Sequence, residues 1–273
     1  MISTHSTLRA QQRGDPPQRA FFAVLALLFT VSTAAAVLRC TSMSAMSEMP
    51  MPGGWMMSML WMRMPGQTWP CATASFLGMW LIMMIAMMLP SLTPMLQHYR
   101  RAVFRMADKR CGRLTFLAGV GYFFVWTVLG LATYAAGITL ADLEMQQPAL
   151  SRLVPGAIGI VVLIAGMYQF TSWKRRHLAI CREAWVHHDP SRVDPNAAWR
   201  HGIQLGLRCS ASCAGLMTVL LVVGVMDMRA MAILTVAMTI ERLAPAGHRI
   251  AQAIGTILMC TGLFLIAHVA GVR

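Results

Sequence analysis

The sequence predicts an all-α protein, a polytopic transmembrane bundle of about seven helices with its N-terminus in the cytoplasm. Of the 273 residues, 57% are hydrophobic and 12% are charged, whereas about 25% of the residues in soluble domains are charged. Several apolar runs approach or exceed about 18 residues, the length expected of a membrane-spanning helix. No run alternates as barrel strands do, so helices are predicted, since these satisfy their own backbone polar groups.

The predicted segments follow one another in a simple order. Residues 1–20 form a cytoplasmic tail, and 21–38 form the first transmembrane helix, a signal anchor that stays uncleaved in the simpler interpretation; cleavage would leave six helices. A Met-rich extracytoplasmic loop occupies 39–70 and the membrane bundle 73–270. The helices of this bundle are predicted at 73–96, 114–137, 153–173, 206–226, 229–244 and 250–270.

The net charge of +13 is explained by the predicted orientation of the chain in the membrane. Of the 23 Lys and Arg residues, 18 lie in segments predicted to face the cytoplasm and five lie on the outer side, which is the positive-inside bias of membrane proteins. The basicity therefore needs no nucleic-acid partner, and the lipid bilayer is the predicted partner. The inner segments are 1–20, 98–113, 174–208 and 241–249.

Two cysteines near the start of the 206–226 helix have the spacing of metal ligands. Cys209 and Cys213 are four residues apart, and Met217 follows after four more. Such side chains share one helix face, with Cβ atoms about 5–6 Å apart, so two thiolates can hold one ion through bonds of about 2.3 Å. The alternative is that the cysteines are passive packing residues. Seven scattered cysteines imply no disulfide framework.

Methionine is the second unusual feature, with 25 in the chain and nine in the outer segment 43–64. Thioethers favour Cu(I) and need not lose a proton to bind it. Closely spaced pairs are therefore predicted to capture metal outside the membrane. The alternative is an interfacial segment in which Trp and Met act as apolar anchors. The residues of these pairs are Met49, Met51, Met62 and Met64.

The 73–96 helix repeats methionine at four-residue spacing, including Met83 and Met87. Pro90 and Pro94 are expected to kink it. A kinked helix lined by methionine beside one lined by cysteine could form a transmembrane metal site. Methionine as a flexible packing residue is the alternative.

Glu241 and Arg242 follow a short apolar run, which leaves them close to membrane depth. Ionisable residues at that depth are functional candidates. The alternatives are that Glu241 pairs with Arg242 or lies at the interface.

Four segments of the chain, within about residues 73–265, carry motifs in a fixed order. Their residues are Met79, Trp80, Met83, Met84, Met87, Met88, Pro90, Pro94 and Met95; Tyr168, Gln169, Phe170, Thr171, Lys174, Cys181 and Arg182; Gly206, Leu207, Arg208, Cys209, Cys213, Leu216, Met217 and Gly224; and Glu241, Arg242, Pro245 and Gly247. These motifs resemble those of the bacterial family of predicted metal-binding integral membrane proteins, a domain of unknown function. The resemblance implies metal binding in the bacterial cytoplasmic (inner) membrane. A third cysteine and an aromatic residue of that pattern are replaced here by Ser212 and Ala214, which leaves Cys209, Cys213 and Met217 as soft ligands.

The sequence has no nucleotide-binding loop, nucleophile elbow or zinc-protease helix, so it favours no enzyme class. The predicted function is soft-metal binding in the membrane, with copper, or another soft or borderline metal, captured, stored or transferred. A periplasmic or membrane protein is a further expected partner. Two other functions stay open: a membrane thiol–disulfide oxidoreductase, although a disulfide across four residues of one helix is demanding, and a non-catalytic assembly subunit.

Overall fold

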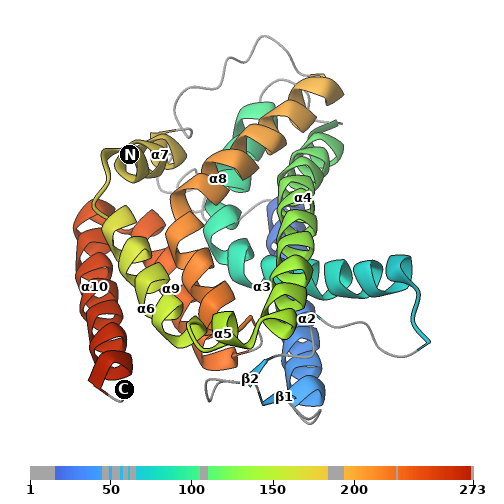
Figure 1. Cartoon of the computed structure of the whole chain (residues 1–273). Coiled ribbons are helices and arrows are strands. Elements are labelled where there is room, and N and C mark those ends of the chain that lie inside the picture. The colour runs from blue at the N-terminus through green and yellow to red at the C-terminus, as the bar shows by residue number, and fades with distance from the viewer. Residues whose placement is uncertain are drawn as a thin grey trace, which may run out of the picture.

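The computed structural model of the chain describes residues 16–44, 49–50, 56–57, 61, 66–104, 110–183, 194–225 and 227–271, and most of them are helical (Figure 1). Two short strands, β1 (Met49–Pro50) and β2 (Met56–Met57), pair antiparallel. Apart from these four residues, every regular element is a helix, so the predicted all-α class is confirmed for the described residues. The helices are α2 (Pro16–Ser44), α3 (Trp69–Phe104), α4 (Cys111–Gln146), α5 (Pro148–Ser151), α6 (Val154–Tyr168), α7 (Ser172–Glu183), α8 (Pro195–Val223), α9 (Met228–Leu243) and α10 (Gly247–Gly271).

Within the described ranges, five helices are long and apolar enough to cross a membrane: α2, α3, α4, α8 and α10. Helices α6 and α7 pass the same test together but are bent by 62° at the break between them. Helix α9 has 16 residues, fewer than the roughly 20 that a span needs. By length and composition the number of candidate spans is therefore five or six, below the predicted seven, although α6 and α9 lie where helices were predicted.

Large apolar side chains cover the outside of the helices, which is consistent with a membrane protein. Phe116 of α4 is 73% exposed, Ile233 of α9 is 67% exposed and Phe264 of α10 is 68% exposed. In water such a surface would be costly at about 25 cal/mol per Å² of apolar area, whereas lipid tails solvate it.

Helix α7 and the first turns of α8 lie in a segment predicted as an inner loop. Thr171 starts α7, because its Oγ1 accepts a hydrogen bond from the backbone N–H of Lys174 at 3.2 Å, the arrangement of a helix N-cap. Helix α8 starts at Pro195 and not at 206, and proline suits a first helical position because the missing N–H has no partner there. These two helix starts explain why helices form in this segment although its composition is polar.

Glycine allows two pairs of helices to approach closely. A Cβ atom on Gly202 of α8 would lie 2.1 Å from the carbonyl oxygen of Ala118 in α4, so only glycine fits there. A Cβ on Gly166 of α6 would lie 3.0 Å from the carbonyl oxygen of Gly255 in α10. Both pairs run side by side in Figure 1. The close contact with α4 limits the rotation of α8 and so decides which of its side chains face the other helices.

Helix α3 continues through Pro90 and Pro94, and its two halves run in different directions in Figure 1, as expected of internal prolines. The indole Nε1 of Trp80 donates a hydrogen bond to the carbonyl oxygen of Trp126 in α4 at 2.9 Å, which fixes α3 against α4. Between Trp80 and Pro90, one face of α3 is buried and rich in sulfur. Its buried methionines are Met83, Met84, Met87 and Met88.

Candidate metal centre

Cys209 lies inside the bundle, where side chains of α3, α4 and α9 meet α8. It is fully buried, with 0% of its surface exposed. Its Sγ lies 2.8 Å from the hydroxyl oxygen of Tyr122 in α4, accepts a hydrogen bond from Nη2 of Arg242 in α9 at 2.9 Å, and lies 4.0 Å from Sδ of Met88 in α3. The tertiary structure thus brings three other helices to one sulfur.

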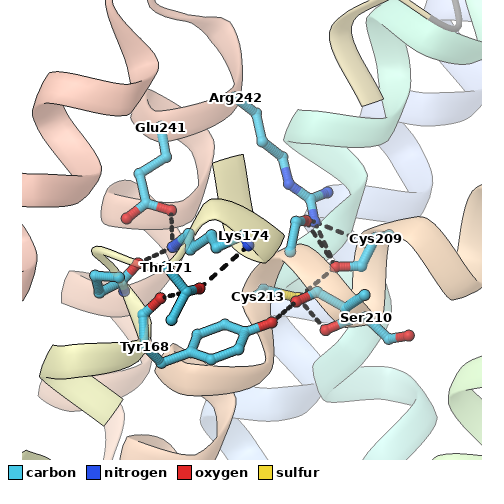
Figure 2. A network of polar contacts seen from close by, with 11 residues as sticks. Tyr168, Thr171, Lys174, Cys209, Ser210, Cys213, Glu241 and Arg242 are labelled. Carbon is cyan, nitrogen blue, oxygen red and sulfur yellow. Dashed lines mark hydrogen bonds and ion pairs between the residues drawn. The ribbon is translucent and has the colours of Figure 1, made fainter. Parts of the chain in front are cut away.

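The guanidinium of Arg242 is held by several hydrogen bonds. Its Nη2 also donates to the carbonyl oxygen of Cys209 at 3.0 Å and to Oγ of Ser212 at 2.9 Å, and its Nη1 donates to Oγ of Ser91 at 3.1 Å. Figure 2 shows Arg242 reaching toward Cys209. Arginine has only donors, so the sulfur is the acceptor, and a thiolate matches a charged donor best.

Cys213 lies one helical turn beyond Cys209 and is also buried. Its Sγ donates to the carbonyl oxygen of Cys209 at 3.0 Å. Next to it, the hydroxyl of Tyr168 donates to the carbonyl oxygen of Ala211 at 2.6 Å. Met217, one further turn along, is buried as well. All three predicted sulfur residues of α8 are therefore inside the bundle.

Glu241 does not pair with Arg242, as one of the sequence alternatives had it, but with Lys174 of α7. Nζ of Lys174 lies 2.7 Å from Oε2 of Glu241 and also donates to Oε1 of Gln169. Figure 2 shows Lys174 and Glu241 facing each other. The Lys174 and Glu241 side chains are only 1% and 3% exposed. Adjacent residues of α9 thus project into two different polar clusters.

The separation of the Cys209 and Met88 sulfurs suits two ligands of one soft ion. Metal–sulfur bonds of about 2.3 Å that meet at about 120° place the sulfurs about 4.0 Å apart, and the observed distance is 4.0 Å. Thiolate and thioether together favour Cu(I). Helix α3 therefore approaches the cysteine through Met88, next to the predicted Met87, which is buried in the same core. The predicted Met83 lines a cavity elsewhere along α3.

The outer methionines are only partly described. Met49 lies in β1, and Met51, Met62 and Met64 lie outside the described residues. In the part of the chain that the structure describes, no group of three or more His, Cys, Asp or Glu side chains could hold a metal ion. Besides cysteine, the described core supplies methionine sulfur as a soft ligand.

Sequence reasoning missed three contacts of the Cys209 cluster: Met88, Tyr122 and Ser91. Met88 carried a signal, because it belongs to the same run of methionines as Met83 and Met87. Tyr122 and Ser91 are single polar residues in apolar helices, and no spacing marks them. Only the packing of α3 and α4 on α8 assigns them to the site.

Comparison with known proteins agrees with a copper role. No curated protein and no solved structure matches the chain. Residues 77–265 match the sequence model of a family described as PpoB2, copper chaperone. The match covers 189 of the 273 residues and includes all of α8 and α9 and α3 from residue 77 onward. The predicted metal, copper, is consistent with this family. Because the match covers more than half of the chain, the chain belongs to the family described as PpoB2, copper chaperone.

Proposed function

We propose that this chain is an integral membrane protein of the bacterial inner membrane that takes up Cu(I) and holds it between Cys209, Cys213 and Met88 for transfer. The observation that carries this proposal is the 4.0 Å separation of the Cys209 and Met88 sulfurs, contributed by two different helices. The family description supports copper as the cargo, and the apolar helices support a bilayer as the surroundings.

The charges of the site support a thiolate at Cys209. Lys174 and Glu241 neutralise each other, which leaves the guanidinium of Arg242, 3% exposed, in contact with the Cys209 sulfur. A buried cation requires a charged or strongly polar partner, and a thiolate supplies it. Hydrogen bonds from Arg242 and Tyr122 then orient the Cys209 sulfur, as hydrogen-bond partners of metal ligands commonly do. Met88 approaches the same sulfur without adding charge.

The same burial argues against thiol–disulfide exchange. An attacking thiolate must reach one sulfur of the pair directly, but Cys209 and Cys213 are 0% and 2% exposed. Both also lie on one continuous helix, where a disulfide across one turn is strained. A small ion can enter where a protein thiol cannot, so the pair suits metal binding better than redox catalysis.

Replacement of Met88 by leucine is expected to weaken Cu(I) binding at this site by at least about tenfold, because even outer partners of metal ligands contribute about 10–100-fold. Competition against a Cu(I) chelator measures the affinity, and X-ray absorption measures the sulfur coordination. Met259→Leu, on α10 at the contact with Gly166, is the matched control and should leave affinity unchanged. Absence of copper from the wild type, or coordination by nitrogen and oxygen alone, would contradict the proposal.

The outer methionines are proposed to capture copper before it enters the bundle. Neutral thioethers in a loop bind weakly and exchange quickly. Changing Met49, Met51, Met62 and Met64 together to leucine is therefore expected to slow loading at limiting copper and to leave the saturated copper content unchanged, as measured by time-resolved metal analysis. Leucine keeps the apolar bulk, so a purely anchoring segment would load at the wild-type rate.

The proposed orientation places 98–113 and 174–200 in the cytoplasm and 43–66 outside, because the inner segments hold 18 of the 23 basic residues. Reporter fusions and labelling of single introduced cysteines are expected to show this pattern in intact cells. Labelling of 43–66 from the cytoplasmic side would overturn both the orientation and capture from the periplasm.

A further inference from the structure

A second group of sulfur side chains lines a small cavity between α2, α3 and α9. Cys40 comes from α2, Met79 and Met83 come from α3, and Met231 comes from α9. Cys40, Met83 and Met231 are 5%, 3% and 8% exposed. None of these residues contacts Cys209 through a hydrogen bond in the described structure, so this cluster is separate from the first centre.

The chemistry of this cavity suits a soft monovalent ion. One thiol and three thioethers from three helices converge, and the other lining residues are Ala36, Arg39 and Ile82. No carboxylate or carbonyl-bearing side chain lines the cavity, so it offers nothing that Mg²⁺ or Ca²⁺ prefers, whereas thiolate and thioether favour Cu(I). The cavity has about the room that one water molecule needs, which admits a bare ion and excludes a hydrated or chelated one.

Arg39 does not prevent cation binding at this position. Its side chain is exposed, so its charge can be solvated outside the cavity, and a Cys40 thiolate would neutralise the ion directly. The neighbouring methionines add no charge. A neutral Cu(I)–thiolate unit surrounded by thioethers thus avoids the cost of an isolated charge in an apolar interior.

We infer that Cys40, Met79, Met83 and Met231 form a second Cu(I) site that precedes the Cys209 centre on the path of the ion. This inference rests on the proposed function. Along α3, Met83 and Met88 are five residues apart, or about 7.5 Å at 1.5 Å per residue, with buried Met84 and Met87 between them. The two centres are thus joined by a buried, methionine-rich stretch of α3.

The order of the two sites follows from their position and their ligands. Cys40 lies near the C-terminal end of α2 and Met79 in the first part of α3, and these two helix ends flank the Met-rich loop. A site with one thiolate binds Cu(I) more weakly than a site with two, because each anionic sulfur adds Coulomb attraction in a low-dielectric interior. The ion is therefore expected to pass from the Cys40 site inward to the Cys209 centre.

Titration of the purified full-length chain with Cu(I) in detergent, against a chelator of known affinity, tests the inference. The wild type is expected to bind two Cu(I) ions per chain, and Cys40→Ser with Met83→Leu is expected to bind one. Met231→Leu, on another helix, should weaken the same ion. The control variant Cys260→Ser with Met259→Leu, on α10, changes one exposed thiol and one thioether away from both sites and should still bind two.

The outcomes separate this inference from the proposed function. One ion in the wild type that survives Cys40→Ser with Met83→Leu and is lost in Cys209→Ser with Cys213→Ser overturns the second site and leaves the proposed function standing. One ion that shows the opposite dependence removes the Cys209 centre and retains the Cys40 site. No bound ion contradicts both. Two ions of which each variant pair removes one confirm both.

Discussion

The Cys209→Ser, Cys213→Ser double variant is expected to lose one Cu(I) ion per chain at every copper concentration. Serine keeps the size of the side chain but replaces two anionic soft ligands with neutral hard ones, for which Cu(I) has little affinity. Met88 alone cannot hold the ion, because a single thioether neither neutralises its charge nor completes its coordination. Elemental analysis of the purified variant beside the wild type measures the loss.

Two exposed cysteines provide the control for this variant. Cys71 and Cys260 are exposed, and changing both to serine should leave copper content unchanged. Equal copper in the wild type and the Cys209→Ser, Cys213→Ser variant would exclude the central site. Thiol titration on the same samples distinguishes the alternative of thiol chemistry, since a metal site predicts thiols protected by copper and an oxidoreductase predicts a disulfide that responds to quinones.

Replacement of Glu241 by glutamine is expected to destabilise the fold by about 3–5 kcal/mol, the range found when one partner of a buried ion pair is removed. Lys174 is 1% exposed and would lose its carboxylate, keeping only the side-chain oxygen of Gln169. The effect should include the attachment of α7 to α9, which this pair joins. Thermal unfolding in detergent measures the change.

A variant without either charge distinguishes the contribution of the ion pair from that of side-chain packing. The Lys174→Met, Glu241→Leu variant should recover most of the lost stability, because an apolar pair of similar volume avoids the desolvation cost. Asp142→Asn, an exposed carboxylate on α4, is the matched control and should change the stability by less than about 0.5 kcal/mol. A Glu241→Gln variant as stable as this control would show that the pair is solvated in the native protein.

Several features of the fold could be predicted from local sequence. The apolar runs of α2, α3, α4, α8 and α10 mark helices that can span a bilayer, because the length of such a run depends only on neighbouring residues. The spacing of Cys209 and Cys213 and the place of Glu241 after a short apolar run are local in the same way, and all three residues are buried. The start of α7 at Thr171 was missed although its cap is also local.

The contacts between helices could not be predicted in this way. The sequence alone determined that Cys209 would lie in an apolar helix and that Arg242 would lie at the end of a short apolar helix. Only the tertiary structure decided that Arg242 would contact Cys209, that Lys174 would contact Glu241 and that Met88 would approach the sulfur. Helix periodicity fixes which side chains share a face of one helix, but the rotation of that face toward its neighbours depends on close contacts such as that of Gly202 with Ala118.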